Sequence, residues 1–215
     1  MTSPIRRILI VDDHDAIRRG LRQLLEGTHY YQVVGEAADG KTALELAITT
    51  RPDIAIIDFT LPLINGVDLS KALIRKLPRI EVLMYTMHAQ ENLINDVFRA
   101  GVRAFVLKSD PATNVIAALD ALSVHRPYFS VPISSKLLDQ LEASKPSSEV
   151  SILTDRERQV VQQVAEGYTN REIAPRLGIS LKTVETHRGN AMHKLGMRTP
   201  ADLVRYALRN NMIQP

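Results

Sequence analysis

The stretch Ile54-Ala-Ile-Ile-Asp-Phe-Thr-Leu-Pro62 shows the feature that recurs through the first half of this chain. Its four apolar residues, 54–57, are typical of a strand buried on both faces of a sheet. The carboxylate of Asp58 follows at once, and Pro62 and Gly66 then turn the chain. We therefore interpret this stretch as a buried strand with an acidic residue at its carboxyl end.

Apolar runs of strand length recur about every 25 residues, with amphipathic helical patterns between them. The runs are Arg7–Val11, Tyr31–Gly35, Ile54–Ile57, Ile80–Met84 and Arg103–Leu107. This alternation predicts an α/β domain: a doubly wound, flavodoxin-like, five-stranded parallel sheet with helices on both faces. In such a sheet the ligand site lies at the carboxyl ends of the strands, where the strand order switches.

Polar residues stand at the ends of four of these runs, namely Asp12, Asp13, Asp58, Thr86 and Lys108. Clustered carboxylates repel one another unless a cation joins them, and hard oxygen ligands suit Mg²⁺. A metal ion beside a carboxylate, with a Lys and a Thr opposite, forms a site for a phosphoryl group. Asp58 is then the expected nucleophile, and its product is an acyl phosphate.

This set of residues, each in register with a predicted strand, resembles the receiver domain of two-component response regulators over about residues 5–125. The resemblance implies that Asp58 is the phosphoacceptor and that Thr86 and Lys108 contact the phosphoryl oxygens. It implies four ligands for Mg²⁺, namely Asp13, Asp58, the backbone carbonyl of Thr60, and Asp12 through a water molecule.

The resemblance also identifies positions that affect switching. Phe105 matches an aromatic residue that turns inward on activation, although a plain core aromatic would look the same in the sequence. Thr60 and His88 match positions that flank the path of the attacking water. The lifetime of the phosphorylated state stays open, because His88 can assist that water, crowd it, or simply be a solvated loop residue.

Composition limits the class of protein. The chain has 215 residues, 45% of them hydrophobic and 24% charged, as in ordinary globular proteins. It has no Cys, which excludes disulfides, thiolate metal sites and a Cys nucleophile. The apolar run near the N-terminus is too short for a signal peptide or a membrane span, so we expect a cytoplasmic protein with no membrane partner.

A polar tether divides the chain. Pro127 bars continuation of the fifth helix, a short amphipathic helix is predicted over 134–142, and residues 143–151 are polar. We predict a receiver domain at 1–128, a linker at 129–150 and a second domain at 151–215. The last 66 residues hold ten Lys/Arg and six Asp/Glu, an excess that fits a polyanionic partner but could also arise by chance.

The second domain has the pattern of four short helices with a helix-turn-helix. Its first helix opens with a capping box, Thr154 and Glu157, and the turn before the third helix is Gly178-Ile-Ser180. One face of the third helix collects Lys182, Glu185, Thr186, Gly189 and His193. That face suits the major groove of DNA, although one polar helix face alone is more often only solvated.

The segment from Leu153 to Leu195 resembles the LuxR-type DNA-binding domain. The matching residues are Leu-Thr-x-Arg-Glu from Leu153, Thr-Asn-x-Glu-Ile-Ala from Thr169, and Thr-Val-x-x-His from Thr183. The resemblance implies phosphate contacts by Lys182, Thr183, His187, Arg188 and Lys194. It places Glu185, Thr186 and Gly189 at base edges. The last helix is the usual dimer surface, so Leu203, Ala207 and Leu208 are candidates for it, or else core residues. Pro175, inside the second helix, has no functional explanation.

A receiver followed by this domain resembles the NarL/FixJ response regulators. The resemblance implies a transcription regulator, not an enzyme with turnover, that a sensor histidine kinase phosphorylates on Asp58. The expected consequence is a homodimer on a double-stranded DNA operator. One alternative is a regulator that acts unphosphorylated or as a heteromer with another regulator. The other is a phosphatase of the haloacid dehalogenase class, which needs a second Asp where this chain has Thr60.

Overall fold

The computed structural model describes residues 5–87, 91–130, 153–197, 199–210 and 212–213. The chain divides into two compact units, residues 1–144 and 145–215, each with its own hydrophobic core. In the described part of the chain, no helix is both long and apolar enough to cross a membrane. The predicted helix over 134–142 and the position of His88 lie outside the described residues.

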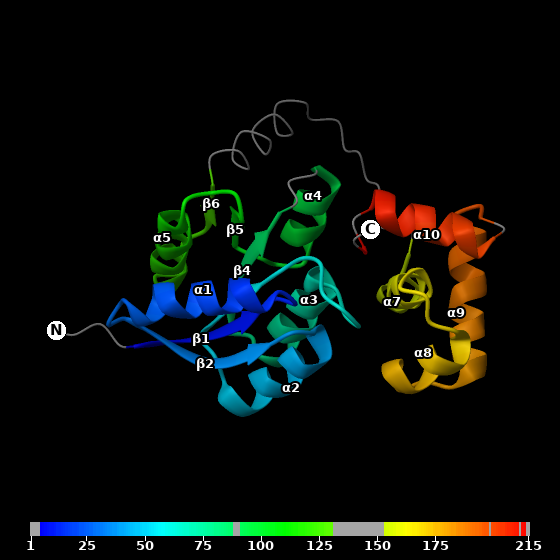
Figure 1. Ribbon diagram of the computed structural model, residues 1–215, viewed down its shortest axis with the longest axis horizontal. Coiled ribbons are helices and arrows are strands. Elements are labelled where there is room, and N and C mark those ends of the chain that lie inside the picture. The colour runs from blue at the N-terminus through cyan, green and yellow to red at the C-terminus, as the bar shows by residue number, and fades with distance from the viewer. Residues whose placement is uncertain (1–4, 88–90, 131–152, 198, 211, 214–215) are drawn as a thin grey trace. The chain divides into compact units, whose positions relative to one another are not determined.

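The first unit alternates strands and helices as predicted (Figure 1). The strands are β1 (Arg6–Val11), β2 (Tyr31–Ala37), β3 (Ile54–Ile57), β4 (Glu81–Thr86), β5 (Ala104–Leu107) and β6 (Tyr128–Phe129). The helices are α1 (Asp15–Glu26), α2 (Gly40–Thr50), α3 (Gly66–Lys76), α4 (Glu91–Arg99) and α5 (Ala112–Ser123). All strand pairs are parallel, in the order β2-β1-β3-β4-β5-β6, so the order switches between β1 and β3.

The predicted count of five strands is wrong by one, because β6 adds a sixth strand at the edge of the sheet. Tyr128 N donates to the carbonyl of Arg103 at 3.0 Å, and Ser130 N donates to that of Phe105 at 3.1 Å. The ring of Phe129 packs on Phe98 of α4, with centroids 4.8 Å apart. Two residues are too few for a recognisable apolar run, so this strand depends on its neighbours rather than on local sequence.

Helices cover both faces of the sheet. Apolar residues of α2, α3 and α4 form one core with one face of the central strands. Residues of α1 and α5, among them Leu21, Leu25 and Val115, form the core on the other face. Strand β3 is fully buried because it lies between these two layers, and this explains its unbroken apolar sequence.

Gly66 brings the start of α3 against the end of β3. Its N–H donates to the carbonyl of Phe59 at 2.8 Å. A Cβ at this position would lie 2.2 Å from the carbonyl oxygen of Asp58, so only glycine fits there. Asn65 caps α3 by accepting from Asp68 N at 2.9 Å. The turn predicted from Pro62 and Gly66 thus fixes the loop that carries Asp58.

The second unit is a bundle of four helices: α7 (Asp155–Ala165), α8 (Asn170–Leu177), α9 (Leu181–Lys194) and α10 (Pro200–Arg209). The predicted capping box of Thr154 and Glu157 is confirmed. Gly178 ends α8 in the left-handed conformation, with φ of 65°, and Ser180 caps α9 by accepting from Thr183 N. The helix-turn-helix of α8 and α9 therefore follows from local sequence.

Candidate functional site

The carboxyl ends of β1, β3 and β5 bring three of the predicted side chains together. Lys108 Nζ lies 2.6 Å from Oδ2 of Asp12 and 2.8 Å from Oδ2 of Asp58. The two carboxylates and the ammonium are almost entirely buried, with side chains 2%, 3% and 5% exposed. One cation thus serves two buried anions at the switch in strand order.

This arrangement changes the acidity of its members. Burial raises the pKa of Asp58, the bond from Lys108 offsets part of that effect, and the charges of Asp12 and Asp13 raise it further. Burial alone would lower the pKa of Lys108, but the pull of Asp58 and Asp12 is stronger, so the pKa of Lys108 is raised. Lys108 therefore stays charged, and the surrounding of Asp58 disfavours the charged form of that side chain.

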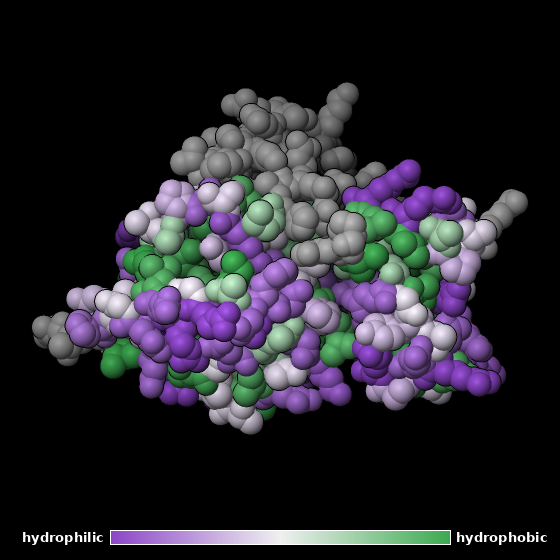
Figure 2. Space-filling view, in the orientation of Figure 1, coloured by the Kyte–Doolittle hydropathy of each residue, from purple (hydrophilic) through white to green (hydrophobic). Residues whose placement is uncertain are grey.

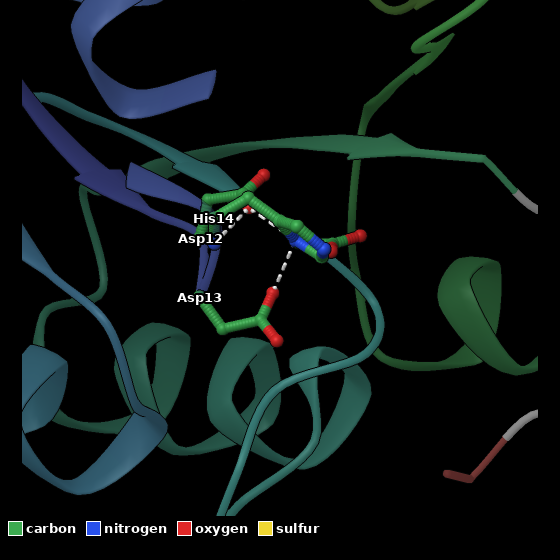
Figure 3. A group of neighbouring side chains, drawn as sticks. Asp12, Asp13 and His14 are labelled. Carbon is green, nitrogen blue, oxygen red and sulfur yellow. Dashed lines mark hydrogen bonds and ion pairs between the residues drawn. The ribbon is translucent and has the colours of Figure 1, made fainter. Parts of the chain in front are cut away.

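Asp13 and His14 form the more open side of this site (Figure 3). The Asp13 side chain is 32% exposed and the His14 side chain 51%. His14 Nδ1 lies 2.7 Å from Oδ1 of Asp13 and 3.3 Å from Oδ1 of Asp12, and its backbone N–H donates to the same Asp12 oxygen at 2.9 Å. Figure 3 shows the imidazole directed at the Asp13 carboxylate.

The acidic residues fit a metal ion. One ligand atom from each of Asp12, Asp13, His14 and Asp58 lies within 4.8 Å of the others. Three of these four ligands are carboxylates, which suit a hard divalent cation. Because Lys108 already engages the two buried carboxylates, the open approach for a cation lies on the Asp13 side. Sequence reasoning missed His14, although its place directly after two aspartates was a signal.

Three other predicted residues lie at or beside these strand ends. Thr86 is the last residue of β4 and fully buried, and its carbonyl accepts from Lys108 N at 2.9 Å. Thr60 is 8% exposed, and its hydroxyl has no hydrogen-bond partner in the part of the chain that the structure describes. Phe105 is fully buried in the core beneath α2, α3 and α4, so its ring already lies inward.

In the second unit, α9 presents a solvent-exposed face. Lys182, Glu185, Thr186 and Gly189 are all exposed. Space is open around Gly189, since a Cβ there would meet no atom within 4 Å. Thr186 Oγ1 donates to the carbonyl of Lys182 at 2.9 Å, so the hydroxyl is bonded within its own helix. This short-chained face can approach a surface closely.

The other candidates on α9 make contacts within the unit. Arg188 Nη1 donates to Oδ1 of Asn170 on α8 at 3.0 Å. Lys194 Nζ lies 2.7 Å from Oε2 of Glu157 on α7. Burial would raise the pKa of Glu157, but the bonds from Lys194 and Thr154 outweigh it, so this pKa is lowered. Arg188 and Lys194 thus tie α9 to the two helices beneath it.

Both halves of the chain match known families. Residues 8–120 match the model of the response regulator receiver domain, and residues 151–207 match that of the bacterial regulatory proteins of the luxR family. The transcriptional regulatory protein LiaR of Bacillus subtilis is 31% identical over 208 residues, which cover 96% of this chain and 99% of LiaR. This chain belongs to the NarL/FixJ-type response regulators.

Solved structures agree with this membership. The response regulator RcsB of Salmonella typhimurium aligns with a TM-score of 0.68 and 26% identity, over 99% of this chain and 100% of RcsB. A complex of the response regulator RcsB with DNA aligns with a TM-score of 0.61 and 25% identity, over 98% of this chain and 100% of that one. The likeness extends through both units of this response regulator.

The response regulator's predicted dimer surface is only partly accessible. Leu203 and Ala207 are fully buried in the core of the four-helix unit, so the alternative that they are core residues holds for both. Their burial follows from the face of α10 on which they lie, since α10 packs mainly against α7. Leu208 is 38% exposed, and for it the dimer role stays a prediction.

Proposed function

We propose that this response regulator is switched by transfer of a phosphoryl group to Asp58. The donor would be a phosphohistidine of a sensor kinase, and the carboxylate of Asp58 would attack its phosphorus as the bond from phosphorus to the histidine nitrogen breaks. The observation that carries the proposal is the position of Asp58: a buried carboxylate at the carboxyl end of β3, 2.8 Å from Lys108 Nζ.

Each neighbour of Asp58 would have its own task. Lys108 would neutralise oxygens of the incoming group, and the hydroxyl of Thr86 would donate a hydrogen bond to it. Asp13, Asp58 and the carbonyl of Thr60 would hold Mg²⁺, and Asp12 would act through water. When bound, Mg²⁺ would supply positive charge to the transferring group. The acidic cluster, formed by Asp12, Asp13, His14 and Asp58, supports this set through the oxygen ligands of its three carboxylates.

The phosphorylated regulator would pair as a homodimer on a two-fold operator in double-stranded DNA. Lys182, Thr183, His187 and Arg188, with Lys194, would contact phosphates, and Glu185, Thr186 and Gly189 would face base edges. The exposed face of α9 supports the base-edge set. For Lys194 the proposal requires that phosphate compete with Glu157 for its ammonium group. We also propose the division into 1–128, 129–150 and 151–215, which places the boundary of the compact units, 144/145, inside the linker.

The test uses the full chain, a small-molecule phosphodonor and Mg²⁺. We expect a mass increase of one phosphoryl group, a shift from monomer to dimer, and tighter operator binding, all absent from Asp58→Ala. Dimerisation and DNA binding that are the same with and without the donor, and the same in Asp58→Ala, would favour the alternative of a regulator that acts unphosphorylated. Dimerisation only in the presence of a second regulator would favour the heteromer.

A further inference from the structure

Arg18, on the first turns of α1, bonds to the backbone of the acidic cluster. Its Nη1 donates to the carbonyl oxygen of Asp12 at 2.8 Å, and its Nη2 donates to Oδ1 of Asp15 at 3.0 Å. Its Nε lies 3.6 Å from Oε2 of Glu36 on β2. Only 15% of the Arg18 side chain is exposed, although the surface over α1 is largely hydrophilic (Figure 2). Arg18 therefore lies between the acidic cluster and β2 rather than in solvent.

The bonded carbonyl belongs to the peptide that joins Asp12 to Asp13. The bond from Arg18 therefore restrains the orientation of this peptide plane, to which Asp13 is attached. Other parts of this turn are held by backbone groups. Asp12 N donates to the carbonyl of Ala37 at 3.1 Å, and His14 N donates to Oδ1 of Asp12 at 2.9 Å. The carboxylate of Asp13, by contrast, is 32% exposed, and its Oδ1 lies 2.7 Å from Nδ1 of His14. The side chain of Asp13 is thus less enclosed than those of Asp12 and Asp58, which are 2% and 3% exposed.

A second layer of contacts orients Arg18. Glu36 is 24% exposed and also lies 2.5 Å from Nε of Arg22. Its two carboxylate oxygens thus face two different arginines. With Asp15 on the other side, the planar guanidinium of Arg18 is held at three of its nitrogens, a geometry that a lysine could not reproduce.

We propose that Arg18 is a positioning residue for the metal side of the phosphoacceptor site, which holds the Asp12–Asp13 peptide so that the Asp13 carboxylate faces Asp12 and Asp58. This inference rests on the proposed function, because it assumes that Mg²⁺ binds there. Partners that orient the ligands of a metal commonly change its affinity by about 10- to 100-fold when they are replaced.

If Arg18 acted only through its charge, its replacement would change the affinity for Mg²⁺ in the opposite direction. Removing a positive charge close to a cation site should strengthen Mg²⁺ binding, because the repulsion between the two cations is lost. Loss of positioning should weaken it. The direction of the change therefore distinguishes the two roles without any assumption about its size.

The matched control is Arg19, the next residue of α1. Its side chain is 70% exposed, and its Nη1 lies 2.8 Å from Oδ2 of Asp15. Arg18→Gln and Arg19→Gln thus remove the same charge beside the same aspartate, but only the first removes the bond to the carbonyl of Asp12. Neither replacement changes Leu21 or Leu25, the buried residues on the core-facing side of α1.

The experiment titrates Mg²⁺ into the full chain by calorimetry and measures amide hydrogen exchange over residues 12–15 without metal. We expect Arg18→Gln to weaken Mg²⁺ binding about tenfold and to speed exchange. We expect Arg19→Gln to stay within about twofold in affinity, since its charge is exposed. Arg18→Lys, which keeps the positive charge but cannot reproduce the bonds of the planar guanidinium, should give a smaller loss in the same direction, and it serves as the test if Arg18→Gln does not fold.

The outcomes separate this inference from the proposed function. If the wild type binds Mg²⁺ and loses it in Asp13→Asn, while Arg18→Gln binds as tightly as Arg19→Gln or more tightly, Arg18 has no positioning role. Unchanged exchange over residues 12–15 in Arg18→Gln leads to the same conclusion. A wild type that binds no Mg²⁺ overturns both this inference and the metal site on which it rests.

Discussion

Replacing Asp58 by asparagine is expected to stabilise the metal-free receiver unit at neutral pH. The reason is the buried charge, since burial raises the pKa of Asp58 above its ordinary value of 3.8 and Lys108 offsets this only in part. A carboxyl whose pKa is raised on folding carries a penalty in its charged form, and this penalty grows as the pH rises through the folded pKa. Asparagine keeps the shape of the side chain and removes the charge.

The size of the gain follows from two opposing effects, the desolvation of the Asp58 carboxylate and its ion pair with Lys108. The asparagine would escape the desolvation of a carboxylate that is 3% exposed, but it would give up the ion pair with Lys108 at 2.8 Å. Lys108 would keep Asp12 at 2.6 Å, so no buried ammonium is left unpaired. We expect a net gain of about 1–2 kcal/mol in the free energy of unfolding, or about 3–7 °C in Tm for a unit of this size.

Thermal unfolding of the full chain with a chelator, followed at several pH values, measures this gain. The difference in Tm between Asp58→Asn and the wild type should be largest at pH 7. It should shrink as the pH falls through the folded pKa of Asp58 towards 3.8. Asp13→Asn is the control, because Asp13 is 32% exposed and its charge costs less to keep. A variant no more stable than the wild type at pH 7, or a difference independent of pH, would refute the reasoning.

Three further changes test the packing of the two units. Gly66→Ala should destabilise the receiver unit by about 3 kcal/mol in denaturant unfolding, because its Cβ would lie 2.2 Å from the carbonyl oxygen of Asp58. Pro175→Ala should stabilise the four-helix unit by about 1–3 kcal/mol, measured by its Tm, because it restores a helical N–H. Lys194→Ala should cost that unit at most about 1 kcal/mol at pH 7, since Lys194 is 37% exposed. Because the pKa of Glu157 is lowered below its ordinary 4.5, this last loss should shrink as the pH falls below 4.5 and disappear below the folded pKa, which unfolding at pH 7 and at a series of pH values below 4.5 would show.

The features that could be predicted from the sequence depend on the periodicity of apolar residues and on the residues at the ends of strands and helices. The buried run at 54–57 and the position of Asp58 after it follow from local pattern, and so do the caps at Thr154 and Ser180. The convergence of Asp12, Asp58 and Lys108 also followed, because parallel strands carry their carboxyl ends to one edge.

Features that depend on contacts between different helices, strands and turns could not be predicted from the sequence. Strand β6 forms because it can pair with the free edge of β5. Two aromatic residues after a proline do not predict a strand from sequence. The bond of Arg18 to the carbonyl of Asp12 joins residues six apart across a strand-to-helix turn, which no periodic pattern encodes. The burial of Ala207 beside the exposed Leu208 depends on the rotation of α10 against its neighbours, and an apolar pattern sets this only roughly.

The energetics of the acidic site connect its stability to its proposed use as a switch. A core built only for stability would not place two carboxylates beside one lysine, because apolar residues of similar volume are often equally stable or more stable there. Here the single ammonium of Lys108 holds both Asp12 and Asp58, so any group that changes the charge at Asp58 also changes what Lys108 binds. The carbonyl of Thr86 accepts from the backbone N–H of Lys108, and β4 and β5 are paired through this point. A change of charge at Asp58 would therefore alter the contacts of Lys108, which lies where β4 and β5 pair.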